Sequence, residues 1–501
     1  MKQHSRRIFS GRGRRRYQPK AKRRVWIWVL AAAVVIAIAA VIWLVLRKGQ
    51  GGGPSAPSPA PTPVVSPTPT PAQGATLNQR SLYECALEYD PNLRKLSGMM
   101  RLTYTNNAGE DLYEIPLHLY PNAVEPGCMK IVGVALNGVN TFYHKENGAS
   151  LIRVPLVPEL KNGETAEVFI EFNISVPERE SRFGAGKNAV MLGNALPIAA
   201  EYEAGAWRTD AYDDTGDPFF SAASDYKVAL TVPERFTVAA TGAVLEEKRE
   251  GGKATRYFYA AGAREFAFAL SDKWTEAEAG DIPVSAYAES MAYARFGADT
   301  AAGALKWMAQ KVCPYPFERI CVTQADMRGG MEYPGLVMIE NEQWRKLYRA
   351  RGEFIIVHEV IHQWLYALVG SDQINEPWVD ESLTEYLAYA YLEDKYGEEY
   401  ARELYDEAAY GLFGYDRRLR LDSPLSAFAQ AEPNAYYYVI YAYGASVYRE
   451  LHEKLGDEAF FGAIKNYCLD NSFGFGTGDK LIACFSEAAG EDLASWFEGR
   501  M

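Results

Sequence analysis

The sequence of 501 residues predicts a multidomain α+β protein. An uncharged apolar run near the N-terminus predicts a transmembrane helix. Alternation in period two, from Leu82 to about Pro283, predicts an antiparallel β-sandwich or saddle of sheets. Helical periodicity after about Tyr287 predicts an α+β domain with a short helical tail. Because single hydrophobic cores rarely grow past about 300 residues, the length also favours several domains.

The N-terminal arm, residues 1–24, is strongly basic and precedes the apolar run, residues 25–46. The first 48 residues carry 13 Lys and Arg and no acidic residue, which leaves 39 basic and 64 acidic residues in the rest. As a helix, the 22 uncharged residues of the run would span about 33 Å. A bilayer's hydrocarbon core is about 30 Å thick.

We therefore predict an uncleaved, single-pass anchor in the cell membrane. The basic flank places the N-terminus in the cytoplasm and the body of the protein outside it. A cleaved signal peptide is the alternative, but the run is too long and no clear cleavage site follows. The basic arm would then contact anionic lipid headgroups, so no nucleic-acid partner is expected. Residues 47–76, rich in Pro and Gly, predict an extended linker.

Residues 77–283 predict a β-sheet domain, because segments such as MRLTYTN, AEVFIEFNISV and YKVALTV alternate in polarity. This region carries no catalytic signature of its own. Residues 284–501 predict a second domain, in which CVTQADMRGGMEYPGLVMIE is typical of strand, turn and strand. Helices are predicted over Gly352–Leu368, Trp378–Tyr396 and Glu398–Leu412.

The six cysteines are too sparse for a disulfide scaffold, and they form no Cys-x-x-Cys zinc pattern. Cys313 and Cys321 could pair across the short segment between them. Buried free thiols are the alternative.

The strongest chemical signal is VHEVIHQW, which holds two of the six histidines of the chain. On a helix, residues i and i+4 share a face, so His358 and His362 could offer imidazole nitrogens to one ion. Glu359 could then reach a water beside that ion, as in the H-E-x-x-H arrangement. The alternative is a helix with two incidental histidines. Its apolar surroundings argue against this, since burying unpartnered imidazoles is costly.

A zinc ion needs a third protein ligand and an open fourth position. The segment WVDESLTEY, which opens the next predicted helix, offers Asp380, Glu381 and Glu385. Spacing alone does not choose among these carboxylates.

These motifs resemble the gluzincin zinc metallopeptidases of the aminopeptidase N and leukotriene hydrolase type. The match to that family consists of HEVIH and, after 18 intervening residues, the glutamate within WVDES. The resemblance extends from YECALEYDPNLRKLSGMMRLTYTN and IPLHLYPNA to the helices after the zinc site. It implies a thermolysin-like α+β peptidase domain over 284–501. It also implies one Zn²⁺ ion on His358, His362 and Glu381, with Glu359 as the catalytic base.

A second motif, GGMEYPG, begins at Gly329 and resembles the family pattern Gly-x-Met-Glu-Asn. The resemblance implies that the backbone of Gly329, Gly330 and Met331 aligns a peptide as an added strand. It also implies that Glu332 binds the free α-amino group, since a carboxylate pairs strongly with an ammonium. Tyr333 stands where the family has Asn, which leaves the details of amine recognition open.

A third motif lies in YYYVIYAYGASVY, where the family has Tyr-x-x-Gly. The register to Gly444 selects Tyr441, whose hydroxyl the resemblance implies as the group that stabilises the oxyanion. The neighbouring tyrosines are expected to be packing residues.

The resemblance thus implies a membrane-anchored zinc aminopeptidase that acts on peptides with a free N-terminus. Asp380, Thr384 and Glu385 are candidates for orienting the ligands. Two alternatives stay open: a zinc endopeptidase or other hydrolase on the same scaffold, and a non-catalytic ectodomain that binds peptides. Because few residues follow Tyr448, we expect the large C-terminal helical domain of bigger members to be absent and the cleft to be more open.

Overall fold

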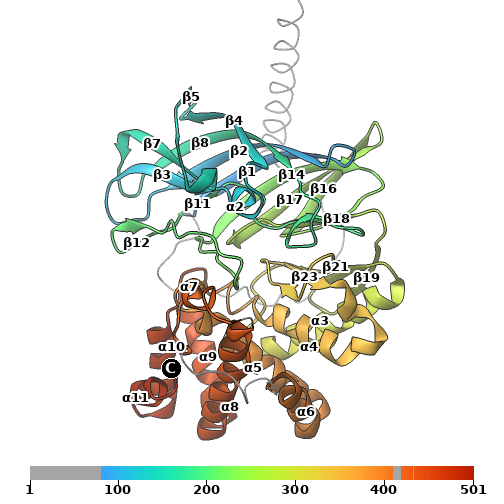
Figure 1. The fold of residues 1–501 in the computed structure, drawn as a ribbon, viewed down its shortest axis with the longest axis vertical. Helices are drawn as coiled ribbons and strands as arrows, with labels where there is room; N and C mark the ends of the chain where they lie inside the picture. Colours follow the sequence, from blue (N-terminus) through green and yellow to red (C-terminus); the bar gives the residue numbers. More distant parts are fainter. Residues whose placement is uncertain (1–79, 410–418, 433) are drawn as a thin grey trace, which may run out of the picture. The chain divides into compact units, whose positions relative to one another are not determined.

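The structure is a computed structural model that describes residues 80–409, 419–432 and 434–501 (Figure 1). The basic arm, the membrane anchor and the Pro-rich linker predicted from the sequence lie outside these residues. Within the described ranges, no helix has both the length and the apolar character needed to cross a membrane.

The first part of the described chain builds an eight-stranded sheet with the order β16-β17-β14-β1-β2-β8-β4-β5 (Figure 1). Its strands are β1 (Leu82–Asp90), β2 (Lys95–Thr105), β4 (Met129–Leu136), β5 (Val139–Asn140), β8 (Thr165–Ser175), β14 (Ser224–Pro233), β16 (Ala243–Glu250) and β17 (Lys253–Ala263). Alternate residues of β2 and β8 are buried, as expected of strands with one face on a core. The sequence predicted antiparallel pairing, but β1 and β14 run parallel because a long excursion separates them.

Two four-stranded sheets, β15-β18-β10-β9 and β11-β3-β7-β6, share one hydrophobic core with the large sheet. Their strands are β3 (Leu112–His118), β6 (His144–Glu146), β7 (Leu151–Leu160), β9 (Phe183–Ala185), β10 (Val190–Leu192), β11 (Ile198–Ala199), β15 (Thr237–Ala240) and β18 (Phe268–Ser271). A short helix, α2 (Tyr120–Val124), and the hairpin of β12 (Tyr202–Glu203) and β13 (Ala206–Trp207) complete this region.

A five-stranded sheet, in the order β19-β20-β21-β23-β22, lies between this core and a second one. Its strands are β19 (Thr275–Ala279), β20 (Val284–Ala288), β21 (Ile320–Ala325), β22 (Gly330–Met331) and β23 (Leu336–Glu340). Alternate residues of β23 point into the two cores. Leu336 and Met338 pack into the core of the sheet region, and Val337 and Ile339 pack into the second core. Such strands read as continuous apolar runs because both of their faces are buried. The domain boundary predicted after residue 283 falls in the turn of the β19–β20 hairpin.

The second core is mainly helical. Its helices are α3 (Met291–Lys311), α4 (Arg349–Ile361), α5 (Pro377–Tyr396), α6 (Glu398–Ala409), α7 (Leu425–Phe428), the π-helical η6 (Tyr437–Tyr443), α8 (Gly444–Leu455), α9 (Asp457–Asp470), α10 (Gly478–Ala489) and α11 (Ala494–Glu498). The mixed α+β architecture predicted from the sequence is thereby confirmed. Every residue of α5 from Pro377 to Leu392 is buried, so this helix is central to the second core.

The first predicted helix of this region, Gly352–Leu368, is shorter than expected and ends at Ile361. After that residue the backbone leaves the α-helical pattern. The backbone N–H of Gln363 donates to the carbonyl of Val360, three residues earlier, at 3.1 Å. The backbone N–H of Ala367 donates to the carbonyl of His362, five residues earlier, at 2.9 Å. The helix predicted over Trp378–Tyr396 is confirmed. It begins at Pro377, where the missing backbone N–H costs nothing because the N–H groups of a first turn have no partner within the helix.

All six cysteines are free thiols, and five of them are buried. Of the two possibilities for Cys313 and Cys321, the structure has the buried thiols.

Candidate active site

Three side chains from α4 and α5 meet at one point. His358 lies in the last turn of α4, His362 caps that helix, and Glu381 lies near the start of α5. The two Nε2 atoms are 3.1 Å apart, and Glu381 Oε2 is 3.2 Å from His358 Nε2 and 3.3 Å from His362 Nε2. In a tetrahedral zinc site with bonds of about 2.0–2.1 Å, ligand atoms lie about 3.3–3.4 Å apart. The three donors therefore fit one face of a zinc coordination sphere.

Two other groups of donor atoms converge nearby: Glu332 with His362 and Asp380, and Asp217 with Glu332 and Glu381. The first of these groups has one imidazole and the second has none. Two histidines with one glutamate is a known donor set of catalytic zinc. The chemistry of the donors thus favours the set on His358, His362 and Glu381.

Each histidine of this set has its second ring nitrogen beside a carboxylate. His362 Nδ1 lies 2.8 Å from Asp380 Oδ1, and His358 Nδ1 lies 3.0 Å from Glu385 Oε2. Such contacts orient a ligating imidazole and fix its tautomer. Asp380 and Glu385, which the sequence left as rival third ligands, therefore lie behind the histidines. The buried Thr384 hydroxyl has no hydrogen-bond partner in the described part of the chain.

Burial and charge act against each other at these groups. Burial lowers the pKa of His358, but the contacts with Glu381 and Glu385 outweigh it and raise that pKa to about 9. Burial raises the pKa of Glu381, but His362 and His358 outweigh it and hold that pKa below its usual value. Because zinc binds unprotonated imidazole, the metal must compete with protons for these histidines.

Glu359 lies directly under the edge strand β22. A Cβ added at Gly330 would lie 2.1 Å from Glu359 Oε1, so only glycine leaves room for the carboxylate. Gly329 has a φ of +69°, which glycine adopts at low cost. Glu359 Oε2 is buried and has no hydrogen-bond partner among the residues that the structure describes. One oxygen of Glu359 is therefore available to a water or a substrate.

Glu332 follows β22 and is 3% exposed. Burial, with the charge of Asp217 next, raises its pKa well above the usual value. Tyr333, which departs from the family pattern, points the other way. Its side chain is fully buried, and its hydroxyl donates to Asn194 Oδ1 at 2.7 Å. The Tyr333 side chain therefore ties the motif to the sheet core.

Sequence reasoning missed two residues of this cluster, Asp217 and Arg182. Asp217 offers an oxygen within 4.8 Å of oxygens of Glu332 and Glu381. Arg182 forms an ion pair with Asp217, and its Nη1 lies 3.2 Å from the sulfur of Met331. Both residues come from loops that flank the small sheets, where no periodicity or motif signals them.

Tyr441 lies on the π-helical turn η6, with its ring 5.8 Å from that of His358. The turn is held close to α5, since a Cβ at Gly444 would lie 2.2 Å from Ser382 Oγ. Burial, followed by the charge of Glu381, raises the pKa of Tyr441 well above its usual value. The phenol therefore stays a hydrogen-bond donor. Tyr436 and Tyr437 pack against it, with ring distances of 5.6 and 5.9 Å.

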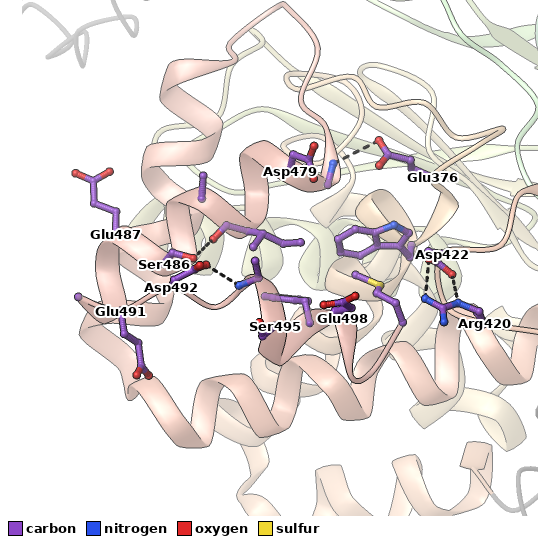
Figure 2. Close-up of a pocket in the computed structure, with 18 residues that line it drawn as sticks. Glu376, Arg420, Asp422, Asp479, Ser486, Glu487, Glu491, Asp492, Ser495 and Glu498 are labelled. Atoms are coloured by element: carbon purple, nitrogen blue, oxygen red, sulfur yellow. Dashed lines mark hydrogen bonds and ion pairs between the residues drawn. The ribbon is translucent and has the colours of Figure 1, made fainter.

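A cavity of about 1010 Å³ opens elsewhere, along α10 and α11 (Figure 2). Seven of its eighteen lining residues are acidic, and its one arginine, Arg420, is paired with Asp422 at 2.9 Å. None of the candidate-site residues described above lines this cavity, and α5 reaches it through Trp378. The cavity is thus separate from the candidate metal centre.

Residues 296–499 match the family model described as Peptidase family M1 domain. This match, together with the relatives that follow, supports an aminopeptidase N-type gluzincin family for this domain. It is similar to the alanine/arginine aminopeptidase of Saccharomyces cerevisiae, with 27% identity over 255 residues, which are 46% of this chain and 29% of that protein. It is also similar to aminopeptidase N of Streptomyces lividans, with 27% identity over 205 residues, which are 38% of this chain and 24% of the relative. The match thus spans less than a third of these relatives.

The fold is that of an M1 zinc metallopeptidase from Deinococcus radiodurans. The TM-score is 0.62 at 18% identity, and the match covers 84% of this chain and 94% of the other. Because the family is one of zinc metallopeptidases, the zinc predicted from the sequence is confirmed at the level of the family.

Gly330→Ala is expected to abolish peptidase activity while zinc still binds. The new methyl group needs the space of the Glu359 carboxylate, and losing a positioned base costs about 10²–10⁴-fold in rate. Zinc content and kcat can be measured on the same preparation. Gly462→Ala in α9 is the control, because an added Cβ meets no atom within 4 Å there. Full activity in Gly330→Ala would contradict the placement of Glu359.

Proposed function

We propose that the protein is a zinc aminopeptidase that removes N-terminal residues from peptides. One observation carries this proposal: the metal donors and the carboxylate of the edge-strand motif lie in one buried cluster. Glu332 and Glu381 have oxygens within 4.8 Å of each other, and β22 crosses over Glu359. A substrate whose amine meets Glu332 would therefore have its first peptide bond near the metal.

His358, His362 and Glu381 would hold the ion, and Asp380 and Glu385 would keep the two imidazoles in orientation. A zinc ion there supplies Lewis-acid chemistry to a peptide carbonyl and to water.

Glu359 is the proposed acid and base. Its unpaired Oε2 would accept a proton from the attacking water and deliver that proton to the leaving nitrogen. Tyr441 would donate a hydrogen bond to the oxygen of the scissile carbonyl as negative charge develops on it. The proximity of its ring to His358 supports this role.

The amine end of the substrate would meet two carboxylates. Glu332 would pair with the α-ammonium group, and Asp217, held by Arg182, would lie beside it. Because β22 is at the edge of its sheet, the backbone of Gly329, Gly330 and Met331 could align a peptide as an added strand. A buried amine site of this kind favours an exopeptidase.

An endopeptidase on the same scaffold is the second candidate. The departure at Tyr333 suggested this candidate, but the hydroxyl of that side chain donates to Asn194 and not to Glu332. A non-catalytic role has less support, because the three metal donors converge and their charges act on the buried Glu359 beside them.

The experiment is an assay of the full chain on aminoacyl-coumarin substrates and on matched N-acetylated peptides, with and without chelator. Cleavage should need a free amine and should stop when zinc is removed. Glu359→Gln should lower kcat by about 10²–10⁴-fold, because the proton acceptor is lost. Equal cleavage of blocked and free substrates would refute the aminopeptidase and favour the endopeptidase.

We also propose that residues 25–46 anchor the protein in the cell membrane and that the linker, residues 47–76, holds the catalytic part outside the cytoplasm. The basis is the length of the uncharged run and the basic residues before it. After cell lysis the protein should sediment with membranes and should resist extraction by alkaline carbonate. Recovery in the soluble fraction would contradict the proposed anchor.

The division into a sheet domain, residues 77–283, and a catalytic domain, residues 284–501, is likewise proposed. The presence of two hydrophobic cores supports it. Because β19 pairs with β20, we place the hairpin of residues 275–288 with the catalytic domain.

A further inference from the structure

The proposed exopeptidase activity requires Glu332 to keep a fixed distance from the metal ligands. Two glutamines, Gln363 and Gln373, contact the Glu332 segment from the side of α4 and α5. Their side chains are 0% and 2% exposed. Neither residue has a role in the chemistry described so far.

Gln363 directly follows the proposed ligand His362. Its Oε1 accepts a hydrogen bond from the Gly335 amide at 2.8 Å. Its Nε2 donates to the carbonyls of Glu332 and Tyr333 at 3.2 and 3.3 Å. All of these bonds go to the turn that carries Glu332, so the amide fixes the backbone of that turn relative to the end of α4.

Gln373 lies in the turn between α4 and α5. Its Nε2 donates to Asp380 Oδ2 at 2.6 Å and lies 3.5 Å from Glu332 Oε1. Asp380 uses its other oxygen on His362 Nδ1. One side-chain amide therefore stands between the carboxylate proposed to bind the amine and the carboxylate that orients a proposed metal ligand.

The turn that carries Gln373 is itself fixed. Asp372 Oδ1 accepts from the amides of Ile374 and Asn375 at 3.2 and 3.1 Å. Asp372 Oδ2 pairs with Arg208 of the sheet region at 2.9 Å. Because the backbone is held on both sides, the direction of the Gln373 side chain is set by the fold.

A glutamine suits this position because it donates hydrogen bonds without carrying charge. A glutamate at position 373 would face Asp380 and Glu332 with a third negative charge. A hydrocarbon side chain would leave Asp380 Oδ2 buried without a donor, which is costly.

We propose that Gln363 and Gln373 are positioning residues that fix Glu332 relative to His362. Gln363 acts on the backbone of the amine site alone. Gln373 acts on the amine site and, through Asp380, on the metal ligand. This inference rests on the proposed aminopeptidase function and assigns different consequences to the loss of each amide.

The test uses the full chain with Gln363→Leu and Gln373→Leu. Gln324→Leu is the matched control, because that buried glutamine accepts from the Glu289 amide at 2.9 Å and contacts none of these residues. Amine recognition is measured as the ratio of inhibition constants for L-leucinamide and its des-amino analogue, 4-methylpentanamide. Zinc affinity is measured by competition with a chromogenic chelator, and the geometry of the metal site by the visible absorption of the Co²⁺-substituted protein.

Gln363→Leu should reduce the preference for leucinamide about tenfold, the scale of a lost hydrogen bond, and leave zinc affinity unchanged. Gln373→Leu should reduce the same preference, weaken zinc binding by about 10–100-fold and alter the Co²⁺ spectrum. Gln324→Leu should change none of these readouts, even if it lowers thermal stability. Met variants, which match the shape of glutamine, replace any Leu variant that does not fold.

Variants of Gln363 and Gln373 that behave like Gln324→Leu would overturn the proposal. An equal loss of zinc affinity in Gln363→Leu and Gln373→Leu would overturn the different roles proposed for the two glutamines. A wild-type protein that does not prefer leucinamide would instead refute the proposed function, together with the part assigned to Gln363. The zinc measurements on Gln373→Leu would still decide the other part.

Discussion

The convergence of His358, His362 and Glu381 within 3.3 Å is the constraint on which the rest of the site depends. Two imidazoles and a carboxylate buried together would be costly unless a cation or protons balanced them. Several features follow from this requirement. The helix α4 ends where His362 must turn, α5 is buried over most of its length, and Asp380 and Glu385 occupy the far side of the imidazoles.

The five-stranded sheet links this centre to the other parts of the protein. Its strands contribute to both hydrophobic cores, so its edge strand β22 is held rigidly beside the helices. The sheet region reaches the site through the hydrogen bond of Tyr333 to Asn194 and the ion pair of Asp217 with Arg182. The buried Arg264 adds a third link, because it donates to the carbonyls of Tyr366 and Leu368 just after α4. Glu332 and the metal ligands thereby have a common frame.

The parts of the site that could be predicted from the sequence are those with local geometry. A helical spacing of four places His358 and His362 on one face. Tyr441, whose ring lies 5.8 Å from that of His358, was selected by the family resemblance through its register to Gly444. Only the family resemblance could identify the third metal ligand, because Asp380, Glu381 and Glu385 all lie within a turn and a half of one helix.

The contacts that the sequence did not reveal join residues far apart in the chain. Asp217 lies beside Glu332 and Arg182 contacts Met331, each across more than one hundred residues, and neither Asp217 nor Arg182 belongs to a motif. The direction of Tyr333 depends on Asn194, which is 139 residues away. Helical periodicity also missed the end of α4, since apolar residues continue to Leu368 while the backbone leaves the helix after Ile361.

The most direct test of the central claim is an anomalous diffraction map, recorded at the zinc edge, from crystals of the zinc-loaded protein. The account predicts one peak at about 2.0–2.1 Å from Nε2 of His358, Nε2 of His362 and an oxygen of Glu381. A peak between Glu332, His362 and Asp380, or between Asp217, Glu332 and Glu381, would contradict it. Either position would remove the metal from Glu359 and Tyr441 and would require a different mechanism.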